Sequence, residues 1–223
     1  MSGIWILVLL TAAAVLPLII VFCWFKAGKL QITLPWFLTA VAAGIISLFA
    51  AALIQNFFPR PGEDSLGQIL FSVFIRIAKV EEASRLLTLI PLVYASDRFI
   101  KNKDITFGAA LGLVAGLGFA AAENASYGMA DINITLLRVF TAAPIHGACG
   151  IRAGAAVSIM KRNSVKAVFL FISAVIIHGA YNLMIVTPAI PSLMAVVTAL
   201  IAILASLPLL KAPGKDNGIL NGA

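Results

Sequence analysis

The sequence predicts an all-α, polytopic membrane protein with about seven transmembrane helices. Hydrophobic residues make up 61% of the 223 residues and charged residues only 11%, whereas about a quarter of the residues in a soluble domain are charged. Several uncharged runs reach the roughly 20 residues that a helix needs to cross about 30 Å of hydrocarbon. The connections are short, so we expect residues 1–223 to form one integral domain of the cell membrane, with a motif-bearing core at about residues 66–186.

Charged or helix-breaking residues bound each apolar run. Lys26 and Lys29 close the first run, and no charge precedes it, which favours a retained span over a cleaved signal peptide. Pro35 opens the second run, at the position where a helix tolerates proline best. We predict spans at residues 4–25, 35–57, 66–96, 105–127, 134–159, 165–186 and 191–210. The third is too long for a straight crossing, so it should tilt, kink near Pro91 or begin along the interface.

Basic residues are distributed very unevenly between the two sides of these spans. If the spans alternate in direction, the loops on one side carry ten basic residues and those on the other side carry Arg60 alone. The positive-inside rule therefore predicts that the amino terminus lies outside and the carboxyl terminus in the cytoplasm. No compact basic face is evident, which argues against a nucleic-acid partner. The ten residues are Lys26, Lys29, Arg98, Lys101, Lys103, Lys161, Arg162, Lys166, Lys211 and Lys215.

The third span contains an unusual cluster of charge. Five ionisable residues fall between Arg76 and Arg85, with apolar runs on both sides. A charge at membrane depth costs about 2.5–3.5 kcal/mol on insertion scales and usually marks function. Helical spacing lets Lys79 and Arg85 both meet Glu82, while Glu81 points about 100° away. We predict that Glu82 belongs to an ionic network and that Glu81 faces a cavity. A surface amphipathic helix with solvated charges is the alternative.

The fourth span combines a bare helical face with two polar residues. Gly108, Gly112 and Gly116 repeat every four residues, which predicts close packing against another helix. Glu123 and Asn124 follow near the end of the same helix. At about 1.5 Å per residue, Glu123 lies about 27 Å beyond the cytoplasmic start of its span.

Three further residues are expected at the same depth. His178 lies about 18 Å beyond the cytoplasmic start of its span, His146 about 18 Å below the outer start of its own, and Glu81 about 22 Å above a cytoplasmic end. With Glu123, these residues all fall between the midplane and the outer face. Four such groups at one level, on four helices, predict a common site. The two cysteines, Cys23 and Cys149, lie in apolar segments and predict neither a disulfide nor a metal pair.

These residues also carry a family resemblance. Glu81-Glu82-Ala-Ser-Arg85 resembles the EExxK/R motif of the PrsW family of glutamic intramembrane endopeptidases, and Phe119-Ala-Ala-Ala-Glu123-Asn124 resembles its FxxxEN motif. Arg138 followed by His146, and then His178-Gly-Ala-Tyr-Asn182, resemble its third and fourth motifs, so the resemblance covers about residues 76–185. The chain is more distantly similar to the CAAX prenyl protease superfamily, whose second motif has histidine in place of Glu123.

Two departures from the family pattern concern the chemistry. Arg85 replaces the commoner lysine, which preserves a charge pair. Asn182 stands where many PrsW-like sequences carry aspartate, which favours a hydrogen-bond donor over a base.

Peptide hydrolysis in a membrane needs a base for water, donors for the oxyanion and a water-filled cavity. Glu81 is our candidate base, with Arg85 as a neighbouring cation. Glu123 or His146 could hold the water from the other side. His178 and Asn182 lie one turn apart on one helical face and could donate to the oxyanion, which are the roles that the superfamily resemblance implies.

The sequence therefore predicts an intramembrane endopeptidase that acts, without a cofactor, on a membrane-anchored protein or peptide. The catalytic set is Glu81, Glu82, Glu123, His146, His178 and Asn182, supported by Arg85, Asn124 and Arg138. The resemblance implies an anti-sigma factor as one candidate substrate.

Three alternatives stay open. The glutamates and two histidines could ligate zinc, although they lack the i, i+4 ligand pair of an HExxH helix. The polar cluster could also belong to a non-catalytic scaffold that binds other spans. A proton-coupled transporter is the third, although it would be expected to show broken helices in repeated halves.

Overall fold

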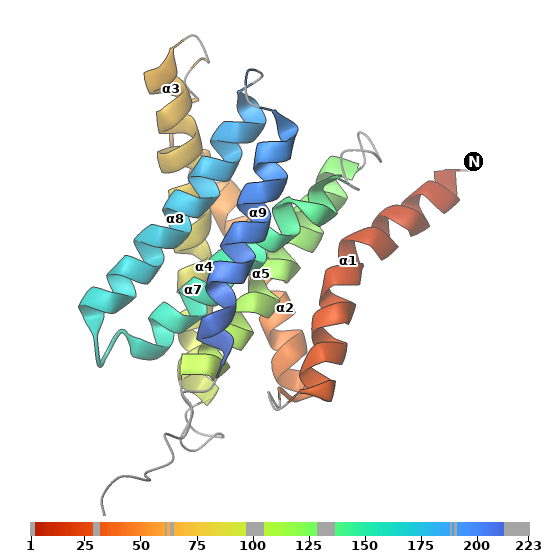
Figure 1. Ribbon diagram of the computed structural model, residues 1–223, viewed down its shortest axis with the longest axis vertical. Helices are drawn as coiled ribbons and strands as arrows, with labels where there is room; N and C mark the ends of the chain where they lie inside the picture. Colours follow the sequence, from red (N-terminus) through yellow and green to blue (C-terminus); the bar gives the residue numbers. More distant parts are fainter. Residues whose placement is uncertain are drawn as a thin grey trace, which may run out of the picture.

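The computed structural model describes residues 3–28, 32–60, 62, 65–96, 105–128, 137–187, 189 and 191–211, with the backbone alone at 3–10, 127, 128 and 192. Helices account for the regular structure of this part of the chain, which contains no strand. They run alternately up and down in Figure 1 and form a single bundle, with α1 along one edge and α8 along the opposite edge. The all-α prediction is therefore confirmed for the described residues.

The first two helices follow the predicted apolar runs closely. Helix α1 spans Gly3–Ala27 and α2 spans Leu34–Gln55. Pro35 lies in the first turn of α2, after Thr33 as the N-cap residue, because a first-turn residue needs no intrahelical N–H partner. The small buried residues of α2 recur along one face, which places this helix against the centre of the bundle.

The third segment is divided into three helical pieces. Helix α3 (Leu66–Leu70) starts with a capping box between Ser65 and Gln68, the π-helix η1 spans Phe71–Lys79, and α4 spans Val80–Ser96. The sequence left a tilt, a kink near Pro91 and a start along the interface open; in the structure Pro91 lies inside α4, and the π-helix comes earlier in the segment. A π-helix changes the angular spacing of its side chains. The predicted contact of Lys79 with Glu82 assumed α-helical spacing, whereas Lys79 is the last residue of this π-helix and is exposed.

Helices α5 (Ile105–Gly128) and α7 (Ala142–Ile159) form the buried centre of the bundle. Gly108, Gly112 and Gly116 of α5 face α7. A Cβ atom at Gly112 would overlap the carbonyl group of Gly150, and one at Gly116 would overlap that of His146. The backbones of the two helices are therefore in direct contact, which is what rows of small residues permit.

A turn interrupts the fifth predicted span. Residues 137–140 are helical, and helix α7 begins at Ala142 after a turn at Thr141. Pro144 explains the break, because proline has no N–H to donate to the carbonyl of Phe140 and clashes with it. The Thr141 hydroxyl bonds the Leu137 carbonyl at 3.0 Å and stabilises the turn. Residues 134–136 lie outside the described part of the chain.

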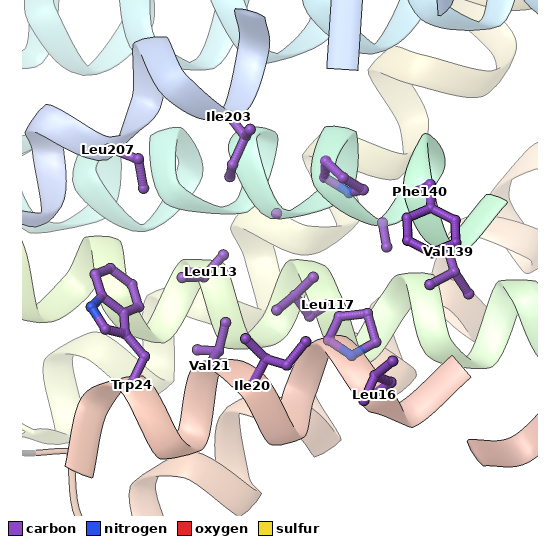
Figure 2. Close-up of a pocket in the computed structure, with 14 residues that line it drawn as sticks. Leu16, Ile20, Val21, Trp24, Leu113, Leu117, Val139, Phe140, Ile203 and Leu207 are labelled. Atoms are coloured by element: carbon purple, nitrogen blue, oxygen red, sulfur yellow. The ribbon is translucent and has the colours of Figure 1, made fainter. Parts of the chain in front are cut away.

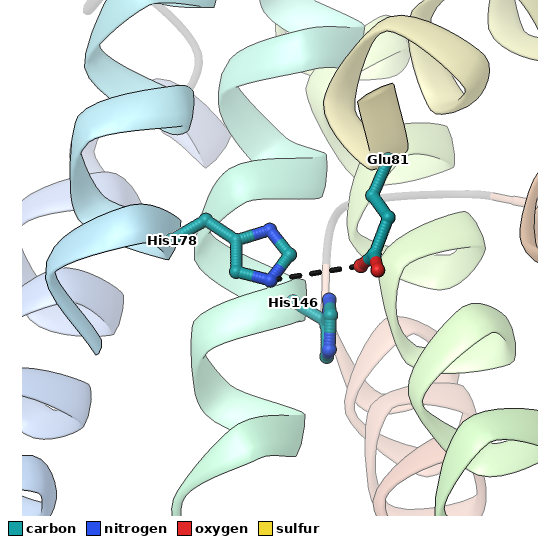
Figure 3. Close-up of side chains that lie close together, drawn as sticks. All are labelled: Glu81, His146 and His178. Carbon is teal, nitrogen blue, oxygen red and sulfur yellow. Dashed lines mark ion pairs between the residues drawn. The ribbon is translucent and has the colours of Figure 1, made fainter. Parts of the chain in front are cut away.

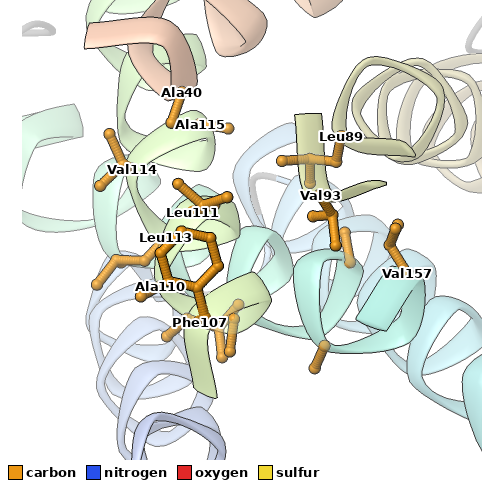
Figure 4. Packing of buried hydrophobic residues seen from close by; sticks show 14 of the residues in the cluster. Ala40, Leu89, Val93, Phe107, Ala110, Leu111, Leu113, Val114, Ala115 and Val157 are labelled. Atoms are coloured by element: carbon orange, nitrogen blue, oxygen red, sulfur yellow. The ribbon is translucent and has the colours of Figure 1, made fainter. Parts of the chain in front are cut away.

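The last helices complete the bundle. Helix α8 spans Ser164–Val186, and Asn163 caps its start by accepting a 3.0 Å hydrogen bond from the Lys166 amide. Helix α9 (Ser192–Ser206) continues into the short 3-10 helix η2 (Leu207–Leu210). Apolar side chains from α2, α4, α5 and α7 fill the main core, as Figure 4 shows for Ala40, Leu89, Leu111 and Val157.

Four helical stretches in the described part of the chain are long and apolar enough to cross a membrane. They are Leu34–Gln55, Ile105–Ser126, Ser164–Val186 and Leu193–Leu210. The first predicted span has described side chains only from Thr11, the third carries the charge cluster, and the fifth is interrupted at Thr141 and contains Arg152. The protein is thus a multi-pass membrane protein, while the count of seven spans stays a prediction.

The described basic residues bear on the direction of insertion. The end of α1, the turn between α7 and α8 and the end of η2 lie at the lower side of Figure 1. These places carry Lys26, Lys161, Arg162, Lys166 and Lys211. Arg60 lies between α2 and α3, at the opposite side. Lys29, Arg98, Lys101, Lys103 and Lys215 lie outside the described residues, so the orientation stays a prediction.

Candidate active site

The polar residues selected from the sequence meet near one end of the bundle. Glu81 lies in the first turn of α4, and Glu123 lies five residues before the end of α5. His146 is the fifth residue of α7, and His178 lies eight residues before the end of α8. Because adjacent helices run in opposite directions, these positions come to the same level. We call this group, with Glu82, Arg85 and Arg138, the polar centre.

Glu82 is the most completely satisfied carboxylate of the polar centre. Its side chain is fully buried, and Arg85 Nη1 donates to Oε2 at 2.5 Å and to Oε1 at 2.6 Å. His178 Nδ1 lies 2.8 Å from Oε1 and is the donor there, since an ionised carboxylate only accepts. Lys79, the other predicted partner, is exposed. Glu82 therefore anchors α8 to α4 through His178.

Glu81 has a different environment although it is the adjacent residue. Gln55 Nε2, at the end of α2, donates to Oε1 of Glu81 at 3.2 Å. The second oxygen, Oε2, is buried and has no hydrogen-bond partner among the described residues. It lies 3.6 Å from Nε2 of His178, the contact drawn as a dashed line in Figure 3. This distance is too long for a good hydrogen bond, so Oε2 remains able to bind a water molecule.

Glu123 forms the other end of the polar centre. Its Oε2 accepts from Arg138 Nη2 at 2.6 Å and from His146 Nε2 at 2.9 Å. Arg138 Nε also donates to Asn124 Oδ1 at 2.9 Å. The side chains of Glu123 and Arg138 are 16% and 14% exposed, so this end approaches the surface while Glu82 and Arg85 do not.

His146 connects the two ends and has a defined tautomer. Arg85 Nη2 lies 3.1 Å from Nδ1 of His146. Because a guanidinium group has no acceptor, Nδ1 must accept this bond, and Nε2 must carry the proton given to Glu123. The same arginine lies over the Phe119 ring, with 4.6 Å from Cζ to the ring centroid. Arg85 therefore fixes both a carboxylate and an imidazole.

The sequence motifs do not account fully for two polar residues, Asn182 and Gln55. Asn182 is half-buried on α8, one turn after His178, and makes no hydrogen bond within the described part of the chain. Gln55 was not selected, because it lies 26 residues before Glu81 and belongs to no motif. A polar residue at the end of an apolar span was its only signal in the sequence.

A separate hollow lies on the other side of α5 and α7. Its volume is about 310 Å³, and it is lined by α1, α5, α7, α9, η2 and the helical residues just before α7, with side chains such as Leu16, Leu113, Phe140 and Ile203 (Figure 2). None of its lining residues is charged. It therefore differs in chemistry from the polar centre, although Gly147 in its wall follows His146 directly.

Buried carboxylates and histidines at membrane depth, together with a free carboxylate oxygen, are features of a membrane-embedded hydrolase. The comparison with protein families agrees with this class. The family model described as PrsW family intramembrane metalloprotease matches residues 33–207. The chain thus belongs to the PrsW family and is an intramembrane protease. No match was found among the curated proteins or the solved structures.

The family description includes a metal, so we compared the polar centre with a zinc site. Glu81, His146 and His178 each offer a ligand atom, and these atoms lie within 4.8 Å of one another. A catalytic zinc usually takes three protein ligands. His178 would suit this role, because Nδ1 donates to Glu82 and Nε2 faces Glu81.

His146 does not suit the role of a ligand. The lone pair on its Nδ1 accepts a hydrogen bond from Arg85, and its Nε2–H donates one to Glu123. Binding of a metal at Nδ1 would expel the guanidinium group, and binding at Nε2 would turn Nδ1–H toward another donor. As arranged, these residues do not fit a zinc ion with three protein ligands.

Proposed function

We propose that this protease uses Glu81 to activate water for hydrolysis of a peptide bond in a membrane-anchored protein or peptide. One observation carries the proposal: Oε2 of Glu81 is buried and unpartnered, and it lies beside Nε2 of His178. Burial of a polar atom without a hydrogen bond is costly, so such an atom needs an explanation. A bound water molecule on Oε2 provides both the missing partner and the nucleophile.

The proton path follows from the donors and acceptors. Glu81 Oε2 takes a proton from the water as its oxygen attacks the substrate carbonyl carbon. The carbonyl oxygen becomes an oxyanion, which accepts hydrogen bonds from Nε2–H of the His178 imidazolium and from the Asn182 amide. Glu81 then gives its proton to the leaving amine, the C–N bond breaks, and the carboxylate is regenerated.

The remaining residues keep this arrangement in place. Glu82 accepts from Nδ1 of His178 and thereby directs Nε2 toward Glu81. Arg85 balances the charge of Glu82 and is itself positioned by the His146 ring. Glu123 and Arg138 orient His146 from the other side. In this proposal Glu123 acts through His146 and does not bind the water itself.

The site level also restricts the substrate. With the amino terminus outside, the polar centre lies in the outer half of the bilayer, since the cytoplasmic ends of the helices carry the basic residues. A substrate span must unwind there to expose a carbonyl group, which is easiest where water satisfies the freed backbone groups. We therefore propose single-span membrane proteins as substrates, with an anti-sigma factor as one candidate suggested by the family resemblance.

The test is a cleavage assay with purified protein and tagged single-span substrates. Wild-type protein should cleave, while Glu81→Gln should lose about 10²–10⁴-fold in rate, the usual contribution of a general base. Cleavage by neither protein, across substrates and lipid conditions, would favour a non-catalytic scaffold. Equal cleavage by both would exclude Glu81 as the base.

A metal-dependent protease is the second candidate, favoured by the family description and by the proximity of Glu81, His146 and His178. Binding of a metal ion by Nδ1 of His146 would require Arg85 to leave that nitrogen. Chelation and metal analysis separate the two mechanisms.

A further inference from the structure

Among the described residues, Gln55 is the one residue outside the sequence motifs that hydrogen-bonds Glu81. It is the last residue of α2, and its Nε2 lies 3.2 Å from Oε1 of Glu81. The two residues belong to different helices and are 26 positions apart. This contact therefore ties the end of α2 to the first turn of α4.

The direction of the Gln55 side chain follows from the packing of α2. Ala40, Gly44, Ser47 and Ala51 are buried along one face, and Gln55 follows Ala51 by one turn on the same face. Gly44 fixes the depth of this face, because a Cβ atom there would overlap the Ala115 carbonyl of α5. The amide of Gln55 thus points into the bundle from a helix that cannot shift freely.

The bond makes the two oxygens of Glu81 unequal. Oε1 accepts from Gln55, whereas Oε2 is buried without a partner beside His178. The terminal torsion of a glutamate side chain is broad and roughly two-fold, so torsional preference alone would not fix the orientation of the carboxylate. A directed donor on one oxygen does fix it.

We propose that Gln55 is a positioning residue for the reaction, which holds Oε1 of Glu81 so that Oε2 receives the water proton. The proposal rests on the proposed role of Glu81 as base. Gln55 touches neither the water nor the substrate in this scheme. Its loss should therefore slow the chemical step and leave substrate binding unchanged.

The neighbouring residue provides a matched control. Asn56 carries the same carboxamide group, but its Oδ1 accepts from Arg60 at the exposed end of α2, with 3.4 Å between the atoms. No hydrogen bond joins Asn56 to Glu81 among the described residues. Substitution of Asn56 thus tests the effect of changing an amide at the end of α2 without changing the donor to Glu81.

The experiment compares steady-state kinetics of Gln55→Met, Gln55→Asn and Asn56→Ala on one cleaved single-span substrate. Methionine keeps the length of glutamine without the donor, and asparagine keeps the amide but is one methylene too short. A hydrogen bond to a charged group predicts a fall in kcat of about 10- to 100-fold for both Gln55 variants. KM should stay within about twofold, and Asn56→Ala should match wild type.

Three outcomes would overturn the assignment. A folded Gln55 variant with wild-type kcat would show that the donor is dispensable. A rise in KM at unchanged kcat would assign Gln55 to substrate binding. Failure of both variants to fold, seen as loss of the thermal transition, would make Gln55 a packing residue. Wild-type inactivity on every substrate would instead refute the proposed function itself.

Discussion

The polar centre and the α5–α7 interface are adjacent, but they differ in how completely their groups are packed and hydrogen-bonded. At the interface, Gly112 and Gly150 bring two backbones into contact and leave no space for a side chain. In the polar centre, Glu81 keeps a buried oxygen without a partner. The interface has no room for another side chain, whereas the polar centre contains a carboxylate oxygen that can still accept a hydrogen bond.

The two regions are connected through His146. Its carbonyl group lies where a Cβ atom of Gly116 would be, and its ring bonds Arg85 and Glu123. Close backbone packing therefore sets the position of the imidazole within the polar centre. The rigid interface allows Oε2 of Glu81 to stay without a protein hydrogen-bond partner, because neighbouring groups cannot collapse onto it.

The largest difference in stability between two inactive variants is expected for substitutions of the adjacent residues Glu81 and Glu82. Glu81→Gln should remove activity and leave the fold intact, because Oε2 has no partner to lose. Glu82→Gln should remove activity and also destabilise the protein by about 3–5 kcal/mol, since it leaves the buried Arg85 cation without its anion. Thermal unfolding in detergent, measured beside the cleavage rate, separates the two effects. Equal, normal stability in both variants would contradict this division of roles.

Substitutions at the α5–α7 interface should change mainly the stability of the protein. Gly112→Ala places a methyl group on the Gly150 carbonyl, so we expect a loss of at least about 1–3 kcal/mol, as for overpacked cores. Gly67→Ala is the control, because no atom lies within 4 Å of an added Cβ there. A wild-type melting temperature for Gly112→Ala would show that α5 and α7 are not held in contact.

A smaller effect on rate is expected at the exposed end of the polar centre. Glu123→Gln keeps an acceptor for the His146 Nε2–H but lacks the charge that balances Arg138. Activity should fall less than in Glu81→Gln, because Glu123 acts through His146. A loss as large as that of Glu81→Gln, in a folded protein, would assign Glu123 a direct role at the water.

The position of the cut tests the level of the polar centre. We expect cleavage in the outer half of the substrate span or just outside it, and helix-breaking substitutions there should raise the rate. Mass spectrometry of the two products gives the position. Reporter fusions after Arg162 and in the loop of Arg60 should report cytoplasm and outside, respectively. A cut in the cytoplasmic third of the span would contradict the topology or the site.

The sequence predicted the helices and most of the polar centre for physical reasons. Apolar length defines a span, and charge at membrane depth is so costly that Glu81, Glu123, His146 and His178 stand out without a structure. Alternation of direction then places them at one level, as the structure does. Local spacing also paired Glu82 with Arg85 correctly.

The misses come from interactions that local spacing does not encode. Lys79 was predicted to meet Glu82 from α-helical spacing, but it lies in the π-helix η1 and is exposed. Pro144 accounts for the turn at Thr141 that interrupts the fifth predicted span, although it lies inside an apolar run. Gln55 meets Glu81 only because α2 packs beside α4. Contacts of this kind depend on how helices assemble, which the spacing of residues along one sequence does not specify.

The role of metal tests the central claim most directly. Glu81 as sole activator of water predicts that the purified protease retains its full cleavage rate after extensive treatment with a strong chelator. Metal analysis of the same sample should find far less than one zinc ion per chain. Loss of cleavage on chelation, with recovery on adding zinc, would show a metal-dependent protease and would contradict a water activated by Glu81 alone.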